Sequence, residues 1–275
     1  MKCIDFDKQF ERYTMEWMKR NAAKYKNNMD VIEGMMPDVY MEFMAKPAQW
    51  LDGLSPEAYF DRFDDAGMLV DWMCEYYVQK VPVPDLLLER ITALGDQAEA
   101  RLLALLDNRG IQHEAELTAI SLLRELESTA PMQRYVDFIA GLSEPDEKGD
   151  MCAESLLSMG EAAVEPVLRA LDTAKEAGRN IFADILSNYP GDERIFALLA
   201  ERFEHAGDQR ALFASYLAKF GDDRALPALK EAAQAEDINY LDYVEIVNAI
   251  EALGGERPPE REFSGDPYYE SLKRV

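Results

Sequence analysis

Residues 221–233 have the sequence Gly-Asp-Asp-Arg-Ala-Leu-Pro-Ala-Leu-Lys-Glu-Ala-Ala, a pattern that ends one helix and starts another. Glycine adopts the left-handed backbone conformation at little cost, and helices often end at such a residue. The carboxylate of a following aspartate can accept hydrogen bonds from the unpaired N–H groups of the next helix. We therefore expect one helix to end at Gly221 and another to begin beside Asp222.

Glycines of the same kind recur at nearly even intervals along the chain. They are Gly95, Gly160, Gly191, Gly221 and Gly254, and an acidic residue directly follows each of the first four. The last three intervals are 31, 30 and 33 residues, whereas the first, of 65, is close to twice as long. We expect the missing boundary at residues 128–131, Ser-Thr-Ala-Pro, because Ser or Thr can cap a helix and proline can open it. A period of about thirty residues is typical of stacked helix pairs.

Apolar residues keep a fixed distance from these glycines. A leucine stands eight residues after each of the first four, at Leu103, Leu168, Leu199 and Leu229. Neighbouring apolar positions complete a stripe at helical spacing, so we expect Leu168, Leu199 and Leu229 to be buried between helix layers. Proline stands six residues after two of the glycines, at Pro166 and Pro227. We expect each proline to remove one backbone hydrogen bond and to bend its helix.

Residues 94–255 resemble the HEAT-like repeats of the armadillo-type superhelix group. The strongest copy runs from Gly221 to Gly254, with Pro227 where the first helices of HEAT repeats often carry a proline. The resemblance implies a curved stack of helix pairs whose second helices line the concave side, and it implies no reaction. The predicted fold is therefore all-α: an α-solenoid, or α–α superhelix, of about five HEAT-like helix pairs with an additional N-terminal helical region.

The sequence predicts three parts. Residues 1–93 hold ten of the 13 methionines and all 3 tryptophans, and we expect a Met- and aromatic-rich helical cap region there. Such a cap is needed because an end repeat would otherwise expose its apolar face. Within it, residues 55–58, Ser-Pro-Glu-Ala, are expected to start a helix with Tyr59, Phe60 and Phe63 on its apolar face. The repeats occupy residues 94–255, and residues 256–275 form an irregular C-terminal tail that Tyr268 and Tyr269 could hold against the stack.

The net charge of −24 excludes several classes of partner. Proteins that bind nucleic acids neutralise phosphates with lysine and arginine, whereas this chain has 53 acidic and 29 basic residues. Anionic membrane surfaces are disfavoured for the same reason. The bases gather in residues 1–30, which carry a net charge of +2 and are expected to be a solvated helix face or to lie against the acidic repeats. No apolar run is long enough to span a membrane, and acids occupy the place of a secretory signal, so we expect a cytoplasmic protein.

The sequence contains no recognisable catalytic or metal-binding motif. Cys3, Cys74 and Cys152 are far apart, and His113 and His205 stand alone, so we expect free thiols, exposed imidazoles and no metal site. The acidic run at residues 144–150 lacks the spacing of a calcium loop. Nucleophile turns, phosphate-binding loops and dinucleotide fingerprints are absent from the sequence, so we expect no catalytic residues and no cofactor.

The most direct functional prediction is a non-catalytic binding or scaffold protein that offers an acidic solenoid surface to a protein or basic peptide. Candidate contact residues on second helices are Glu154, Asp184, Asp242, Tyr243 and Glu245; the other interpretation of each is a solvated polar helix face. An acidic mimic of nucleic acid would be a special case of this prediction.

The alternative is an enzyme, such as a lyase-type HEAT-like protein, with a pocket in the N-terminal Met- and aromatic-rich region. A deep pocket with convergent polar groups near Trp50 or Trp72 would favour this alternative, and a packed core would argue against it. The sequence does not indicate an oligomeric state.

Overall fold

All five repeat glycines have the positive φ that the sequence predicts. The computed structural model of the chain describes residues 2–21, 23–24 and 28–272. In it φ is 54° at Gly95, 66° at Gly160, 94° at Gly191, 80° at Gly221 and 75° at Gly254. An added Cβ would meet no other atom within 4 Å at any of them. These positions therefore require glycine because of their backbone conformation and not because of crowding.

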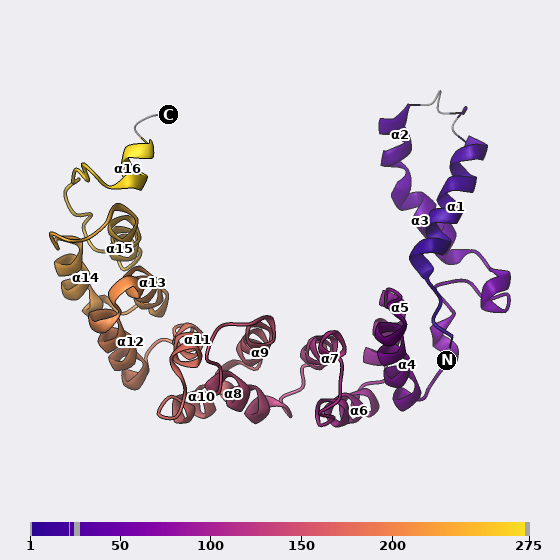
Figure 1. Cartoon of the computed structure of the whole chain (residues 1–275), viewed down its shortest axis with the longest axis horizontal. Coiled ribbons are helices and arrows are strands. Elements are labelled where there is room, and N and C mark those ends of the chain that lie inside the picture. The colour runs from indigo at the N-terminus through magenta and orange to yellow at the C-terminus, as the bar shows by residue number, and fades with distance from the viewer. Residues whose placement is uncertain (1, 22, 25–27, 273–275) are drawn as a thin grey trace. The chain divides into compact units, whose positions relative to one another are not determined.

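The described part of the chain is all-α and contains no strand (Figure 1). It divides into two compact units, residues 1–131 (unit 1) and residues 132–275 (unit 2). None of the helices in the described ranges is both long and apolar enough to cross a membrane. Unit 1 contains α1 (Phe6–Asn21), α2 (Met29–Gly34), α3 (Met36–Ala45), α4 (Ala66–Gln79), α5 (Asp85–Thr92), α6 (Asp96–Leu106) and α7 (His113–Glu125), with 3-10 helices η1 (Gln49–Leu51) and η2 (Phe60–Arg62).

Unit 2 is built from helices that pack against their neighbours in the chain. It contains α8 (Met132–Ala140), α9 (Glu147–Ser158), α10 (Val164–Ala170), α11 (Glu176–Leu186), α12 (Glu193–His205), α13 (Arg210–Phe220), α14 (Leu226–Ala233), α15 (Tyr240–Ala252) and α16 (Pro267–Leu272), with 3-10 helices η3 (Gly160–Ala163), η4 (Gly207–Gln209) and η5 (Asp223–Ala225). Helix α8 contacts α9, α10 and α11, α12 contacts α13, and α15 contacts both α13 and α14. These contacts are compatible with a helical repeat, and α8 begins directly after Pro131, where the missing boundary was expected.

Aspartate caps are present after two of the four glycines. Asp192 Oδ1 accepts a hydrogen bond from the backbone N–H of Arg194 at 2.9 Å, and Asp222 Oδ1 accepts one from the backbone N–H of Arg224 at 3.0 Å. The prediction is wrong at the other two places. Gly95 is itself the N-cap of α6, without a side-chain bond, and Glu161 lies inside η3.

This difference in capping shifts the buried stripe by one residue. Leu199 and Leu229 are fully buried as predicted, eight residues after their glycines. Leu168 is only half-buried, and Val167 takes the buried position instead, as Leu102 does in α6. The reason is that Asp192 and Asp222 insert one residue between glycine and helix, whereas Gly95 and Gly160 begin the turn themselves.

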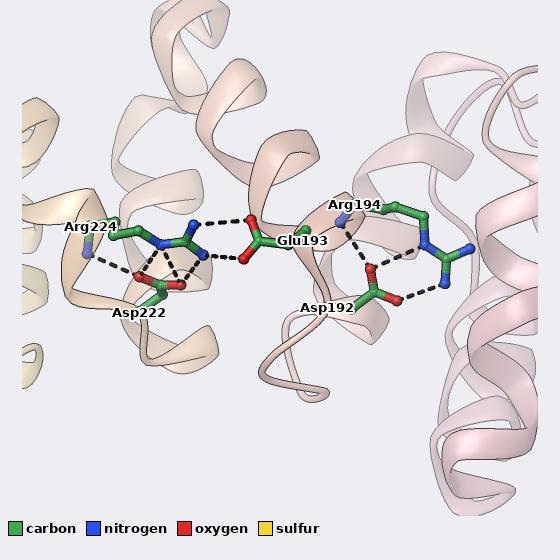
Figure 2. A network of polar contacts seen from close by, with 5 residues as sticks. All are labelled: Asp192, Glu193, Arg194, Asp222 and Arg224. Atoms are coloured by element: carbon green, nitrogen blue, oxygen red, sulfur yellow. Dashed lines mark hydrogen bonds and ion pairs between the residues drawn. The ribbon is translucent and has the colours of Figure 1, made fainter.

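Arg224, three residues after Gly221, connects its own helix cap to the preceding helix pair (Figure 2). Its Nη1 and Nη2 donate to the two carboxylate oxygens of Glu193 in α12, both at 3.0 Å. Its Nε donates to Asp222 Oδ1 at 2.9 Å. The guanidinium carbon also lies 4.3 Å from the centre of the Phe196 ring. One side chain thus joins an ion pair, a cap and an aromatic face.

Arg194, 30 residues earlier, repeats the polar part of this arrangement. Its Nη2 donates to Asp192 Oδ2 at 2.7 Å and to Glu165 Oε1 of α10 at 2.5 Å. Hydrogen bonds from the Arg194 side chain and backbone lower the pKa of Asp192 to about 2. The recurrence of Gly-Asp-x-Arg therefore gives the turns before α12 and before α14 the same polar connection.

The two prolines occupy the first turns of their helices. Pro227 is the second residue of α14, and Pro166 is the third residue of α10. N–H groups in the first turn of an α-helix have no intrahelical partner, and proline is favoured there. Each proline therefore stands where its missing N–H costs less than in a helix interior, in a first turn directly after the 3-10 helix η3 or η5.

Unit 1 departs from its predicted local structure at residues 55–63. Residues 56–59 form turns followed by η2, in place of the expected α-helix. Tyr59 and Phe60 are nevertheless buried, as the expected apolar face required. Their rings lie 6.2 and 5.4 Å from the Trp72 ring. Packing of these rings against Trp72 determines the conformation of the segment, because its aromatic side chains reach the core without an α-helix.

The C-terminal segment is more ordered than predicted. Its last part forms α16, and the rings of Tyr268 and Tyr269 lie 6.1 and 5.0 Å from that of Tyr240 in α15, as expected for residues that hold the tail. Asp266 Oδ2 accepts a hydrogen bond from the Tyr240 N–H at 3.1 Å. Lys26 of the basic N-terminal segment and residues 273–275 of the tail lie outside the described residues.

Candidate functional site

A groove in unit 2 is lined by α9, α11 and α13 and by residues beside them. Its volume is about 660 Å³, within the range typical of ligand sites. It is lined by Ser143, Pro145, Asp150, Ala153, Glu154, Leu157, Glu176, Ala177, Asn180, Ile181, Asp184, Gln209 and Tyr216. Four of these residues are carboxylic acids, and none is lysine or arginine.

Helix α9 presents one face to the groove. Asp146 caps the helix, since its Oδ1 accepts a hydrogen bond from the Gly149 N–H at 2.7 Å. The lining residues Asp150, Glu154 and Leu157 then follow at intervals of four and three. This spacing places them on the same side of the helix.

Helix α11, which packs against α9, contributes a second face to the groove. Glu176, Asn180 and Asp184 are four residues apart and share a face. The start of α11 packs closely on the end of α8, because a Cβ added to Gly178 would lie only 2.2 Å from the Ile139 carbonyl oxygen. Glycine at position 178 therefore permits the close packing of α11 on α8, and this packing positions the acidic face of α11.

The carboxylates of the groove differ in their partners. Asp184 Oδ1 accepts a hydrogen bond from Lys219 Nζ at 2.9 Å. Burial, and then the nearby charge of Asp184, raise the pKa of Tyr216 to about 12. The side chain of Asp150 makes no hydrogen bond or ion pair with the described residues. Asp150 is thus the groove carboxylate most available to an incoming cation.

Arg202 of α12 neutralises the other end of the groove. It forms an ion pair with Glu176, and its Nη2 donates to Asn180 Oδ1 at 2.6 Å. The hydrogen bond from Arg202 is the main cause that lowers the pKa of Glu176. Its guanidinium also lies 5.0 Å from the centre of the Phe213 ring. Arg202 therefore connects α11 with α13. Because Glu176 is paired with Arg202, its role in the groove is structural.

Apolar side chains lie between these polar groups. Leu157, Ile181 and Tyr216 are half-buried and face the groove beside Ala153 and the buried Ala177. Such a lining can contact the aliphatic stems of lysine or arginine while the carboxylates contact their charged ends. The arrangement offers binding groups for a cationic segment and no nucleophile held by an oriented base.

The structure brings together two of the five residues that the sequence predicted. Glu154 and Asp184 both line the groove, from α9 and α11. Asp242, Tyr243 and Glu245 lie on α15, which contributes no residue to this lining.

The α15 residues have other local roles. Asp242 takes part in the start of its helix, where its Oδ2 accepts from Asn239 Nδ2 at 2.7 Å. Tyr243 is buried, and its hydroxyl donates to the Pro259 carbonyl at 2.9 Å, so it offers little surface to a partner. Glu245 is exposed to solvent.

Sequence reasoning missed Asp150, Glu176 and Tyr216. The first two stand four residues before Glu154 and eight before Asp184, on the same helix faces as those predicted acids. Their helical spacing was thus a usable signal. Tyr216 carried no comparable signal, because a tyrosine before a repeat glycine is equally typical of the core.

The N-terminal region contains both a packed core and open depressions. Trp72 is buried, and the rings of Phe60 and Phe63 each lie 5.4 Å from its own, which argues against a pocket there. Trp50 is half-buried and lines a cavity of about 370 Å³ that Arg12 and Lys46 also line. The cavity at Trp50 is compatible with the enzyme alternative. The packed core around Trp72 argues against a pocket at that residue.

The described ranges contain no group of three or more His, Cys, Asp or Glu side chains that could hold a metal ion. His113 and His205 are exposed, Cys152 is buried, Cys3 and Cys74 are half-buried, and none of these three cysteines is in a disulfide. The sequence matches no protein-family model, and no curated protein matches it significantly.

Proposed function

We propose that unit 2 is a HEAT-like α-solenoid whose groove between α9, α11 and α13 binds a basic segment of a partner protein, without catalysing a reaction. The observation that carries this proposal is the lining of the groove, which combines four carboxylates with apolar side chains and contains no basic residue. The net charge of −24 supports it further, because a surplus of negative charge steers basic partners toward the molecule.

Recognition would depend on the α9 side of the groove. Asp150 and Glu154 would contact lysine or arginine of the partner, while Leu157 and Ile181 contact the aliphatic parts of those side chains. Asp184 would exchange its ion pair with Lys219 for one with the partner, and Glu176 would stay with Arg202. Strong nucleic-acid or anionic membrane binding is not part of the proposal, and the cytoplasmic address stays a prediction.

The test uses two labelled peptides, one with the repeat Lys-Ala-Leu-Lys and one with glutamate in place of each lysine. Fluorescence anisotropy is measured with the full chain at about 50 and 500 mM salt, where screening differs strongly. We expect the basic peptide to bind, the acidic peptide to bind at least about tenfold more weakly, and high salt to weaken the basic complex.

The variants locate the binding. The double change Asp150→Asn with Glu154→Gln removes two groove charges without altering size, and it should weaken binding about tenfold. Glu245→Gln is the matched control, because this exposed acid lies outside the groove, and it should bind as the native chain does. Equal affinity of all three proteins, or of both peptides, would contradict the proposal.

An enzyme with a pocket in unit 1 remains the second interpretation and has weaker support. The cavity beside Trp50 favours it, but the residues that line this cavity include no serine, cysteine or histidine.

A further inference from the structure

A small cavity in unit 1 has aromatic walls. It lies between α1, α3 and the start of α5, has a volume of about 180 Å³, and is lined by Phe6, Asp7, Phe10, Tyr40, Phe43, Met44, Val83, Pro84, Asp85 and Leu86. The rings of Phe10 and Tyr40 are 5.1 Å apart and perpendicular, at 90°. The Phe43 ring lies 5.3 Å from Phe10 at 53°. With Phe6, four aromatic residues therefore line one space.

Two carboxylates line the same cavity. Asp7 stands in the first turn of α1, and Asp85 is the first residue of α5. Neither side chain makes a hydrogen bond or ion pair with the described residues, and neither caps its helix. Burial, and then the charges of Asp85, Glu89 and Asp7, raise the pKa of Tyr40. Both acids thus line the cavity together with Tyr40, and their charge is unpaired.

Aromatic faces and carboxylates attract the same kind of ligand. The face of an aromatic ring carries negative potential and binds cations, most strongly where water is excluded. Met44, Val83 and Leu86 add apolar lining, which suits methyl groups better than the strongly hydrated N–H groups of a primary ammonium. The volume is below the range of drug-sized pockets, so the cavity suits one head group.

We propose that this cavity binds a methylated ammonium group, as a free quaternary amine or on a methylated lysine. Phe10, Tyr40 and Phe43 offer aromatic surface to the methyl groups, and Asp7 and Asp85 supply the opposite charge. This site lies in unit 1, does not depend on the groove of unit 2, and can be tested separately from it.

The experiment measures binding to the full chain by calorimetry at constant ionic strength. The probes are choline, its neutral carbon analogue 3,3-dimethylbutanol, and the N-acetyl amides of trimethyllysine and lysine. We expect choline and the trimethyllysine amide to bind at least about tenfold more tightly than the neutral analogue and the lysine amide, respectively. Preference between choline and the trimethyllysine amide tells whether the natural source is a small amine or a protein.

Variants at exposed positions assign the binding to the cavity. Tyr40→Leu removes one ring and should weaken choline binding at least about fivefold, whereas Tyr40→Phe keeps the ring and should bind normally. Asp7→Asn with Asp85→Asn should weaken binding about tenfold. Tyr268→Leu and Asp38→Asn, at positions outside this cavity, should change nothing.

Three results would overturn the inference: no binding of either methylated ammonium at millimolar concentration, equal binding of choline and its neutral analogue, or native affinity in Tyr40→Leu. Circular dichroism of each variant distinguishes loss of the site from loss of the fold.

Discussion

Units 1 and 2 are both helical, but they are stabilised by different kinds of side chain. In unit 1, aromatic rings gather around Trp72, which has Tyr59, Phe60, Phe63 and Tyr76 as ring neighbours. In unit 2, a glycine, an aspartate cap and an arginine recur at the turns that precede α12 and α14. The comparison shows that a repeated local sequence pattern makes secondary structure predictable. A dense aromatic core, in contrast, permits irregular segments that local sequence patterns do not predict.

The largest expected effect is in the aromatic core. Trp72→Ala should lower the free energy of unfolding by about 3–5 kcal/mol, because it empties a large volume among several rings. The matched variant in unit 2 is Phe213→Ala, a buried ring with Tyr216 5.5 Å away. Urea denaturation, monitored by circular dichroism, measures the free energy of unfolding of both variants. A smaller loss of stability in Trp72→Ala than in Phe213→Ala would contradict the stated difference between the two units.

The next effect tests the one-residue shift of register in unit 2. Leu199→Ala should cost about 2–5 kcal/mol, because Leu199 is fully buried. Leu168→Ala, at the equivalent distance from its glycine, should cost about 1 kcal/mol or less, because Leu168 is only half-buried. Urea denaturation measures the free energy of unfolding of both variants. Equal losses would mean that both helices share one register.

Close packing of α11 on α8 gives a third prediction. Gly178→Ala places a Cβ 2.2 Å from the backbone oxygen of Ile139, so α11 must shift, at a cost of about 1–3 kcal/mol. Gly191→Ala tests the other use of glycine, since its cost arises from φ of 94° without any close neighbour. Gly178→Ala should therefore also weaken peptide binding in the groove, and Gly191→Ala should not; anisotropy with the basic peptide measures this.

The smallest effect concerns the arginine connections. The folded pKa of Asp192 is about 2, below its unfolded value near 3.9, so Asp192 stabilises unit 2 above pH 4 and this contribution is lost as pH falls toward 2. Asp192→Asn should make thermal stability less dependent on pH between about 5 and 2. High salt should reduce the difference, since Arg194 is exposed and Asp192 is only half-buried. Identical pH profiles for both proteins would show that the connection does not contribute.

The same contrast explains how far sequence reasoning reached. The all-helical class, the positive φ of Gly95 to Gly254 and the burial of Leu199 and Leu229 follow from local rules that need no tertiary knowledge. The position of Val167 did not follow, because it depends on whether Gly160 or an aspartate begins the turn. The non-helical segment before Phe60 did not follow either, because ring packing decided it.

The residues that line the groove could be predicted only in part, because some of them depend on contacts between distant segments. Glu154 and Asp184, which line it, were among the predicted contact residues because acids on a helix face are visible in the sequence. Tyr243 was placed on the same surface because the sequence does not reveal that residues 259–263 cover it; Phe263 packs 5.0 Å from its ring. Contacts between distant segments, such as Arg202 with Glu176, are equally absent from a periodic pattern.

Hydrogen exchange with and without the basic Lys-Ala-Leu-Lys peptide tests the central proposal most directly. We expect the peptide to slow amide exchange in α9, α11 and α13, whose residues line the groove, and to leave α15 and the helices of unit 1 unchanged. Slower exchange in α15 or in unit 1 without any change in α9 and α11 would place the acidic binding surface elsewhere and contradict the account.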